Sequence, residues 1–275
     1  MWIKKKKKRK IGAFRNLLVS FSHFKDLTIG KSGYGPGHEA RGELTLSDDQ
    51  PQKKCYYLQR NSCEGDLKFI SSFLFEFDCY TSLHRPAIMQ ILGYILPILD
   101  EKCCGIFFPD TSNENLECLL HGLRSGNELS PTNQSIIIFG IAAGMAYVHQ
   151  NNIFHRTLNP SNIVIDDNFH PKISDFLDSI ILVEGVDQLE FDTEIGIPAY
   201  MAPEVVNKEM KLTNKTDVYA FSSILYSILT KRVLYAETKM SVVQLISKKT
   251  LKGILPELKE GEIPPILLDL MNRCW

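Results

Sequence analysis

The sequence has no uninterrupted run of about 18 apolar residues, which is roughly what an α-helix needs to cross a bilayer. It also has no cysteines at metal-binding or C-x-x-C spacing, and its seven cysteines are an odd number. An apolar stretch follows the basic N-terminus, but Arg15 and Asn16 interrupt it, so no secretory signal is expected. These absences predict an intracellular, cytoplasmic protein with reduced cysteines.

Charge is nearly balanced overall but unevenly placed. The net charge is −1, and Lys4 to Lys10 carry seven positive charges, so the other residues together carry −8. Such an acidic body gives no reason to expect a nucleic-acid-binding domain. Residues 4–10 alone fit a nuclear-localisation signal, a contact with nucleic acid or an anionic membrane, a short solvated tail, or the remnant of a longer protein.

The composition, with 44% hydrophobic and 23% charged residues, is that of a soluble globular protein, and 275 residues allow one two-lobed unit or two small domains. Between residues 25 and 60, short apolar segments separated by glycines predict strands, among them 55–59. A helix is predicted over 66–83, and strands are predicted near 91–97 and 103–108. The helix would share one apolar face among Phe69, Phe73, Phe77 and Tyr80.

The second half of the chain reads as mainly helical. Residues 131–150 predict a helix capped by Ser130, with Pro131 in its first turn; its apolar run suggests a buried central position. A second buried helix is predicted over 216–230, with Thr216 as its cap. Strands followed by helices favour an α+β fold with two segregated lobes.

Several motifs occur in a fixed order: "IGKSGYG", "HRT" followed by Asn162, "DFL" and "APE". In this order the chain resembles a eukaryotic protein kinase domain over residues 25–275. Segments such as "LHRPAIMQILGY", "HPKISDF" and "DVYAFSSILYSILT" are similar to the tyrosine-kinase-like group. The resemblance implies a basic segment 1–24, a β-rich N-lobe at about 25–110 and a helical C-lobe at about 111–275. It also implies that the chain stops before the family's last C-terminal helix.

The same resemblance implies ATP and Mg²⁺ as cofactors, with departures at the nucleotide site. Gln59 stands where the family has the lysine that holds the phosphates, and an amide brings no positive charge. Gly37 replaces the valine that packs on adenine. Glu76 matches the usual partner of that lysine, although it would also fit an exposed helix carboxylate. The glycine loop retains the cofactor-binding candidates Gly30, Ser32, Gly33 and Gly35. ATP binding is therefore expected to be weak or absent.

The catalytic loop departs as well. Thr157 stands where the family has its catalytic aspartate, and a hydroxyl is a poor base. Asn159 replaces the lysine that contacts the γ-phosphate. Asn162 and Asp175 match the two metal ligands, and both offer oxygen to Mg²⁺. Leu177 replaces the glycine of the hinge.

Other motif residues are expected to be structural. Ile197 replaces the threonine that contacts the catalytic aspartate. Asp217 matches the carboxylate that ties down the loop backbone, with His155 packing under the loop and Arg156 bonding the activation segment or an anion. The sequence predicts a pseudokinase that acts by binding a protein partner. An active kinase acting on Ser/Thr or Tyr of proteins, and a truncated non-functional fragment, remain the alternatives.

Overall fold

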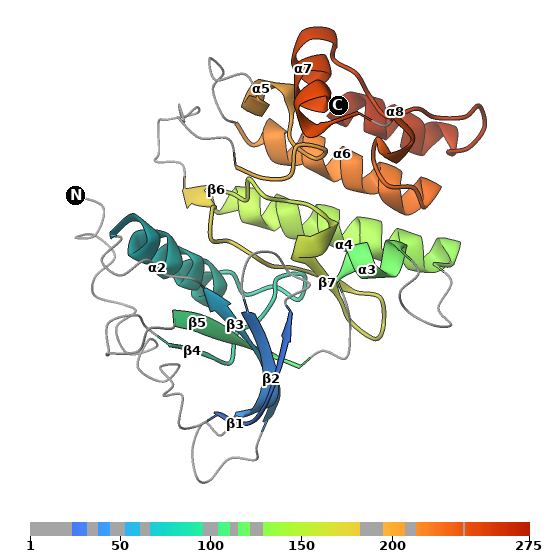
Figure 1. Cartoon of the computed structure of the whole chain (residues 1–275). Helices are drawn as coiled ribbons and strands as arrows, with labels where there is room; N and C mark the ends of the chain where they lie inside the picture. Colours follow the sequence, from blue (N-terminus) through green and yellow to red (C-terminus); the bar gives the residue numbers. More distant parts are fainter. Residues whose placement is uncertain are drawn as a thin grey trace. The chain divides into compact units, whose positions relative to one another are not determined.

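The computed structural model describes residues 24–31, 38–44, 53–60, 67–95, 104–110, 115–121, 129–181, 195–206, 213–238 and 240–275. The chain forms two compact units. Unit 1 comprises Met1–Leu74 and Met89–Ser112, and unit 2 comprises Phe75–Ile88 and Asn113–Trp275. Strands form most of the described part of unit 1, whereas helices dominate unit 2 (Figure 1).

Unit 1 is built on a five-stranded antiparallel sheet with the order β1-β2-β3-β5-β4. Its strands are β1 (Phe24–Lys31), β2 (His38–Leu44), β3 (Lys53–Arg60), β4 (Gly93–Ile95) and β5 (Cys104–Pro109). The strands predicted at 55–59, near 91–97 and at 103–108 are therefore confirmed. Phe107 and Phe108 of β5 point to opposite faces of the sheet, and both are buried, so both faces are covered at this point.

Helix α2 (Leu67–Ser82) confirms the predicted helix. Phe73, Phe77 and Tyr80 of its apolar face are buried, as the spacing of three and four residues requires. The side chain of Phe69, the fourth member of that face, lies outside the described residues.

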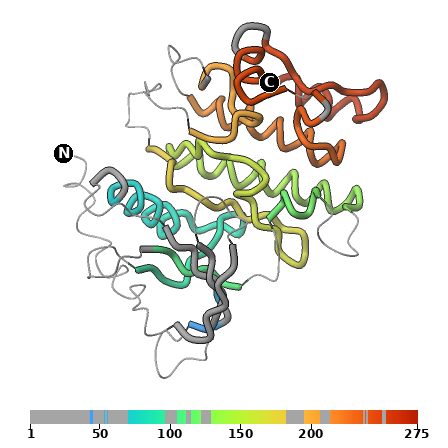
Figure 2. Tube along the Cα trace, viewed as in Figure 1, coloured from blue at the N-terminus to red at the C-terminus, as the bar shows by residue number. Residues whose placement is uncertain are grey.

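Unit 2 holds the remaining elements, which follow one another in chain order from green to red (Figure 2). Two short antiparallel pairs, β7–β8 and β6–β9, accompany the helices. The elements are α3 (Leu116–Leu120), α4 (Pro131–Gln150), β6 (Ile153–Phe154), η3 (Pro160–Asn162), β7 (Ile163–Ile165), β8 (Pro171–Ile173), β9 (Ile180–Ile181), α5 (Pro203–Val206), α6 (Lys215–Thr230), η4 (Ala236–Thr238), α7 (Val242–Lys252) and α8 (Pro265–Cys274).

Helix α4 begins as predicted, because the Ser130 hydroxyl accepts the N–H of Asn133 and Pro131 is the first helical residue. Its inner side is fully buried through Ile137, Ile141 and Val148. The predicted burial of this helix therefore holds for one side only, since Phe139 is 75% exposed. The opposite side consists largely of small residues. These count as apolar in the sequence, but they expose little apolar surface and need not be buried.

Helix α6 is buried as predicted, but its cap is different. The N-cap residue is Asn214, and Thr216 already lies inside the first turn, where its hydroxyl donates to the carbonyl of Thr213. The Thr213 hydroxyl instead accepts the N–H of Lys215. Two threonines three residues apart made the sequence ambiguous, and the first of them takes the N–H.

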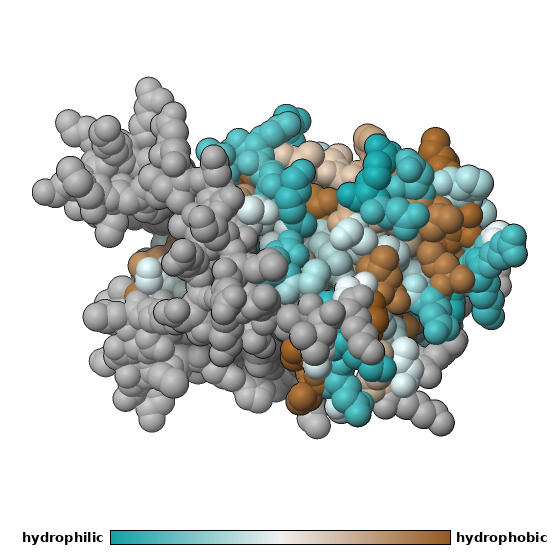
Figure 3. Space-filling view, turned by 90° about the horizontal axis from the view of Figure 1, so that it is seen from above, coloured by the Kyte–Doolittle hydropathy of each residue, from teal (hydrophilic) through white to brown (hydrophobic). Residues whose placement is uncertain are grey.

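The core between α6 and α8 contains Leu225, Tyr226, Leu234, Ile263 and Met271. On the surface, hydrophobic residues in brown form separate patches among hydrophilic residues in teal (Figure 3). Among the described residues no helix is both long and apolar enough to cross a membrane.

Candidate functional site

The site is a loop that joins β6 to β7 in unit 2. It runs from His155 through Thr157 and Asn159 into the short helix η3, which ends at Asn162. His155 is fully buried, Thr157 is 8% exposed, and Asn159 and Asn162 are buried as well. Arg156 has a φ of 69°, in the left-handed region that non-glycine residues seldom adopt. A loop of buried polar residues with strained backbone needs specific partners to hold it.

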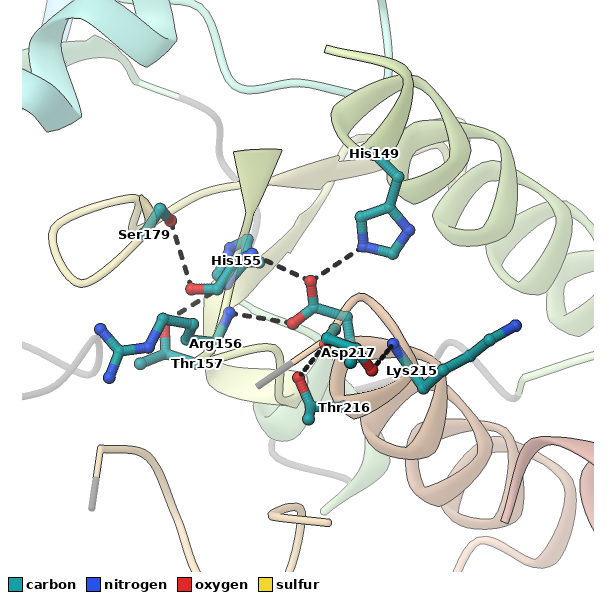
Figure 4. Close-up of polar contacts among 9 residues, drawn as sticks. His149, His155, Arg156, Thr157, Ser179, Lys215, Thr216 and Asp217 are labelled. Carbon is teal, nitrogen blue, oxygen red and sulfur yellow. Dashed lines mark hydrogen bonds and ion pairs between the residues drawn. The ribbon is translucent and has the colours of Figure 1, made fainter. Parts of the chain in front are cut away.

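Asp217, at the start of α6, is the main partner of the loop backbone (Figure 4). Its Oδ2 accepts the N–H of His155 and its Oδ1 accepts the N–H of Arg156, each at 2.9 Å. His149 at the end of α4 places Nε2 2.9 Å from Oδ2. Burial opposes ionisation, but the hydrogen bond and charge of His149 and the contacts with His155 hold the pKa of Asp217 below its ordinary value. The predicted role of Asp217 in tying down the loop is confirmed.

The side chains of His155 and Arg156 hold the segment that follows β8. His155 Nε2 donates to the carbonyl of Ser174 at 2.9 Å, and its ring packs against Phe176. Arg156 Nη1 donates to the carbonyl of Asp178 at 3.1 Å. Both residues therefore have the structural contacts expected of them.

Thr157 sits between the other candidates. Its Oγ1 lies 3.3 Å from His155 Nδ1 and 3.4 Å from the carbonyl oxygen of Asp175. In the neutral imidazole with its proton on Nε2, which donates to Ser174, Nδ1 accepts and Thr157 is the donor. The hydroxyl has one proton for these two acceptors, and at neutral pH it cannot take a proton from an alcohol.

The two asparagines of the loop bind the Thr157 backbone. The side-chain N–H groups of Asn159 and Asn162 both donate to the Thr157 carbonyl, at 2.7 Å and 2.8 Å. Asn159 Oδ1 also accepts the N–H of Ser161, so Asn159 is the N-cap of η3. Both the nitrogen and the oxygen of its amide are therefore hydrogen-bonded. Asn162 donates its hydrogen bond to the Thr157 carbonyl through its amide nitrogen, whereas a metal ion would bind its amide oxygen.

Asp175 follows β8 with a φ of 65°. Its N–H donates to the hydroxyl of Tyr80 in α2 at 2.7 Å, and the next residue, Phe176, is fully buried with its ring 5.3 Å from that of Tyr80. The residue with strained backbone is thus Asp175. Leu177 is also described, and its φ is not positive. A leucine at the hinge is compatible with this conformation.

The donor set fits magnesium. Asp175 offers a carboxylate and Asn162 an amide oxygen, and Mg²⁺ is commonly held by one or two such protein ligands plus water and phosphate. Thr157 connects them, since its hydroxyl contacts the Asp175 carbonyl and its own carbonyl binds Asn162. The described residues contain no group of three or more His, Cys, Asp or Glu suited to a metal.

The nucleotide candidates are only partly described. Gly30 lies in β1 opposite Glu39, whereas Ser32, Gly33 and Gly35 lie outside the described residues. Gln59 lies in β3 opposite His38 and Gly105, and its side chain is likewise outside them. Glu76 of α2 is fully buried, so its interpretation as an exposed helix carboxylate is wrong.

One buried polar residue of unit 2 was not predicted from the sequence. Lys249 of α7 is 1% exposed, and its Nζ donates to the carbonyls of Pro198, Ala199 and Met201 at 3.1, 3.0 and 2.7 Å. The ammonium also lies 4.8 Å from the centre of the Tyr219 ring. It fixes the segment that contains the "IPAYM" motif.

Comparison with known proteins agrees with this geometry. A family model described as the protein kinase domain matches residues 49–275. The chain belongs to the protein kinase family. This kinase-family chain is 29% identical to the probable serine/threonine-protein kinase PBL4 of Arabidopsis thaliana, over 83% of the chain and 55% of that relative.

Two further relatives come from the same plant. The chain is 30% identical to cysteine-rich receptor-like protein kinase 26 of Arabidopsis thaliana, over 78% of the chain and 31% of that relative. It is 28% identical to the probable serine/threonine-protein kinase PBL28, over 98% of the chain and 75% of the relative. The chain therefore spans about half of PBL4 and a third of the receptor-like kinase.

Proposed function

We propose that this kinase-family protein is a pseudokinase of the tyrosine-kinase-like group, which acts by binding a protein partner rather than by transferring phosphate. The observation that carries the proposal is Thr157. It stands at the family's proton-accepting position, and its hydroxyl is engaged by His155 Nδ1 and the Asp175 carbonyl. A hydroxyl so placed can orient a neighbour but cannot serve as the general base.

Nucleotide binding belongs to the same proposal. Asn162 and Asp175 would hold Mg²⁺, which neutralises phosphate charge when it is bound. Gln59 at the lysine position leaves the phosphates without their usual ammonium group. ATP binding should therefore be weak or absent, and any that remains should depend on the metal.

The second candidate is an active kinase acting on Ser/Thr or Tyr of proteins. It is favoured by the loop itself, because Asp217 holds the backbone of His155 and Arg156 in place and both metal-ligand candidates are present. The relatives' names, serine/threonine-protein kinase and receptor-like protein kinase, point in the same direction.

A nucleotide-binding experiment tests the proposal. Thermal melts of the purified chain with ATP, with and without MgCl₂, should show no shift at micromolar nucleotide. At millimolar nucleotide we expect at most a small upward shift that requires Mg²⁺, because a ligand stabilises the native state in proportion to its occupancy. Asp175→Asn should abolish that shift.

The matched control is Asp167→Asn, which removes an exposed carboxylate in the turn after β7 and should leave the shift unchanged. A micromolar dissociation constant in the absence of metal would contradict this account of the site. It would mean that the protein binds ATP by contacts other than those of Asp175 and Asn162.

A further inference from the structure

A groove lies on the exposed side of α4 in unit 2, away from the catalytic loop residues discussed above. Its floor is α4. One wall is the segment Arg85–Ala87 after α2, and the other is the β7–β8 turn with Pro171 and Lys172 at the start of β8. The groove has a volume of about 670 Å³, within the range of roughly 300–1,000 Å³ that is usual for ligand pockets. All the residues that line it belong to unit 2.

Small residues of α4 create the groove. A Cβ atom on Gly140 would lie 2.5 Å from Cγ of Pro171, so only glycine allows the helix to approach β8 so closely. One turn further along, Ala143 is exposed and leaves the floor open. Phe139, 75% exposed, borders the groove with a large ring that the described residues leave largely uncovered.

The charge at the groove is positive. Lys172 Nζ lies 3.5 Å from Oδ2 of Asp166, and His170 Nδ1 lies 3.4 Å from Oδ1 of the same carboxylate. Asp166 is held ionised: burial opposes it, but the N–H groups of His170 and Asn168 and the charge of Lys172 lower its pKa. The positive charge of Lys172 therefore neutralises the negative charge of Asp166.

Arg85 carries the remaining charge. The residue is exposed, and its guanidinium lies 5.0 Å from the centre of the Tyr147 ring. Within the described residues no carboxylate forms an ion pair with it. Stacking on an aromatic ring restricts the guanidinium and leaves its N–H groups available for a carboxylate, to which arginine binds with two parallel hydrogen bonds.

We propose that this groove docks a segment of a partner protein in which a large apolar side chain lies close to an Asp or Glu. The apolar side chain would pack beside Phe139 over Ala143, and the carboxylate would pair with Arg85. The basic residues Lys4–Lys10 of this chain carry the same charge sign as Arg85, so they are excluded as the occupant.

A docking groove can serve an active kinase as well as an inactive one, so its role does not depend on whether the catalytic loop is active. Its experiment measures peptide binding and not nucleotide binding or phosphate transfer. Failure of either proposal can therefore be recognised separately.

The test selects peptides from a random library displayed on phage, using the full chain as bait. We expect the recovered peptides to place Asp or Glu within one helical turn of a large apolar residue. Fluorescence polarisation of the labelled synthetic peptides should show at least about tenfold weaker binding to the Ala143→Glu variant, which fills the floor and repels the carboxylate. Arg85→Ala should weaken binding by about fivefold.

The matched control is Val243→Glu, which puts the same charge at a 74% exposed apolar position of α7 and should leave the affinity unchanged. Thermal melts show whether each variant is folded. The proposal is overturned if no recovered peptide loses affinity on Ala143→Glu, or if acidic residues are not enriched. It is also overturned if sedimentation shows a dimer that Phe139→Ser dissociates, since a second copy would then be the occupant.

Discussion

Among single side chains, Lys249 holds the most unusual position in unit 2. Three carbonyl oxygens accept its three N–H groups, so the charged form has every hydrogen bond it can make. Burial nevertheless lowers the pKa of Lys249 to about 7, and the nearby charge of Glu204 acts in the opposite direction. The three hydrogen bonds therefore stabilise the ammonium group and oppose the cost of removing it from water.

This residue makes stability depend on pH. The pKa in the folded state, about 7, lies below the ordinary lysine value, so between these two values the folded state binds fewer protons than the unfolded state. The free energy of unfolding should then rise with pH above 7, because the penalty for burying the ammonium fades. Urea denaturation between pH 6 and 9 measures this rise, which Lys249→Met should remove.

Lys248→Met is the control, because Lys248 is the exposed neighbour on the same helix, and it should keep the wild-type pH dependence. Lys249→Met should also expose the segment 195–202 to protease, since three carbonyls lose their donor. An unchanged pH slope in Lys249→Met would show that another group is responsible.

The sequence singles out the candidate site residues but not this lysine. Thr157, Asn162 and Asp175 stand out because the motif around them fixes their positions in the loop. Lys249 lies in a run of polar residues, and lysine is rarely buried without a partner. The available signal is its spacing of four residues from Leu245, which is also buried, but that spacing gains meaning only once α7 is known.

At the scale of elements, α4 packs against β8 through glycine. Cβ atoms on Gly140 and Gly144 would come within 2.5 Å of Pro171 and 2.7 Å of Ile173. Ile173 offers the flexible end of a side chain, whereas Pro171 offers a rigid ring. The tighter constraint is therefore at Gly140.

Gly140→Ala should destabilise the protein although alanine favours helix by about 1 kcal/mol. Overpacking against the proline ring typically costs about 1–3 kcal/mol, which exceeds that gain. Chemical denaturation measures the change in the free energy of unfolding. Ala142→Gly, at an exposed position of the same helix, gives the size of the propensity effect alone, and a stabilised Gly140→Ala variant would show that α4 moves away from β8 freely.

Helices α2, α4 and α6 were predictable because each segment is longer than a typical strand and its apolar residues do not alternate as they would in a strand. The exposed side of α4 was not, since Gly and Ala are apolar in the sequence whether or not anything covers them. The short pairs β6–β9 and β7–β8 were missed too: Ile153–Phe154 and Ile180–Ile181 are too short to give a period, and the pairing is between residues distant in sequence.

At the scale of the whole molecule, the family's reaction depends on several residues that lie far apart in the sequence. Gln59 belongs to unit 1, and Thr157 and Leu177 belong to unit 2. Because such residues act as a unit in catalysis, their effects should be far from additive. We expect no detectable autophosphorylation from the native chain or from Thr157→Asp, Gln59→Lys or Leu177→Gly alone. The combined variant should give a measurable signal with labelled ATP.

Adding Asp175→Ala to the combined variant is the control and should remove the signal, because the metal ligand is lost. Robust phosphate transfer by the native chain, lost on Asp175→Ala, would refute the pseudokinase proposal. It would mean that positioning and metal suffice with Thr157 in place.

The anchoring of the loop by Asp217 has a consequence for how such a protein changes over generations. The carboxylate binds the backbone of His155 and Arg156, so the fold of the loop depends on peptide groups that every substitution at position 157 retains. These two hydrogen bonds therefore place no demand on the side chain at position 157, whose own contacts are those of its hydroxyl with His155 and Asp175. Once a lineage no longer needs phosphate transfer, residue 157 can drift while the loop around it keeps its shape.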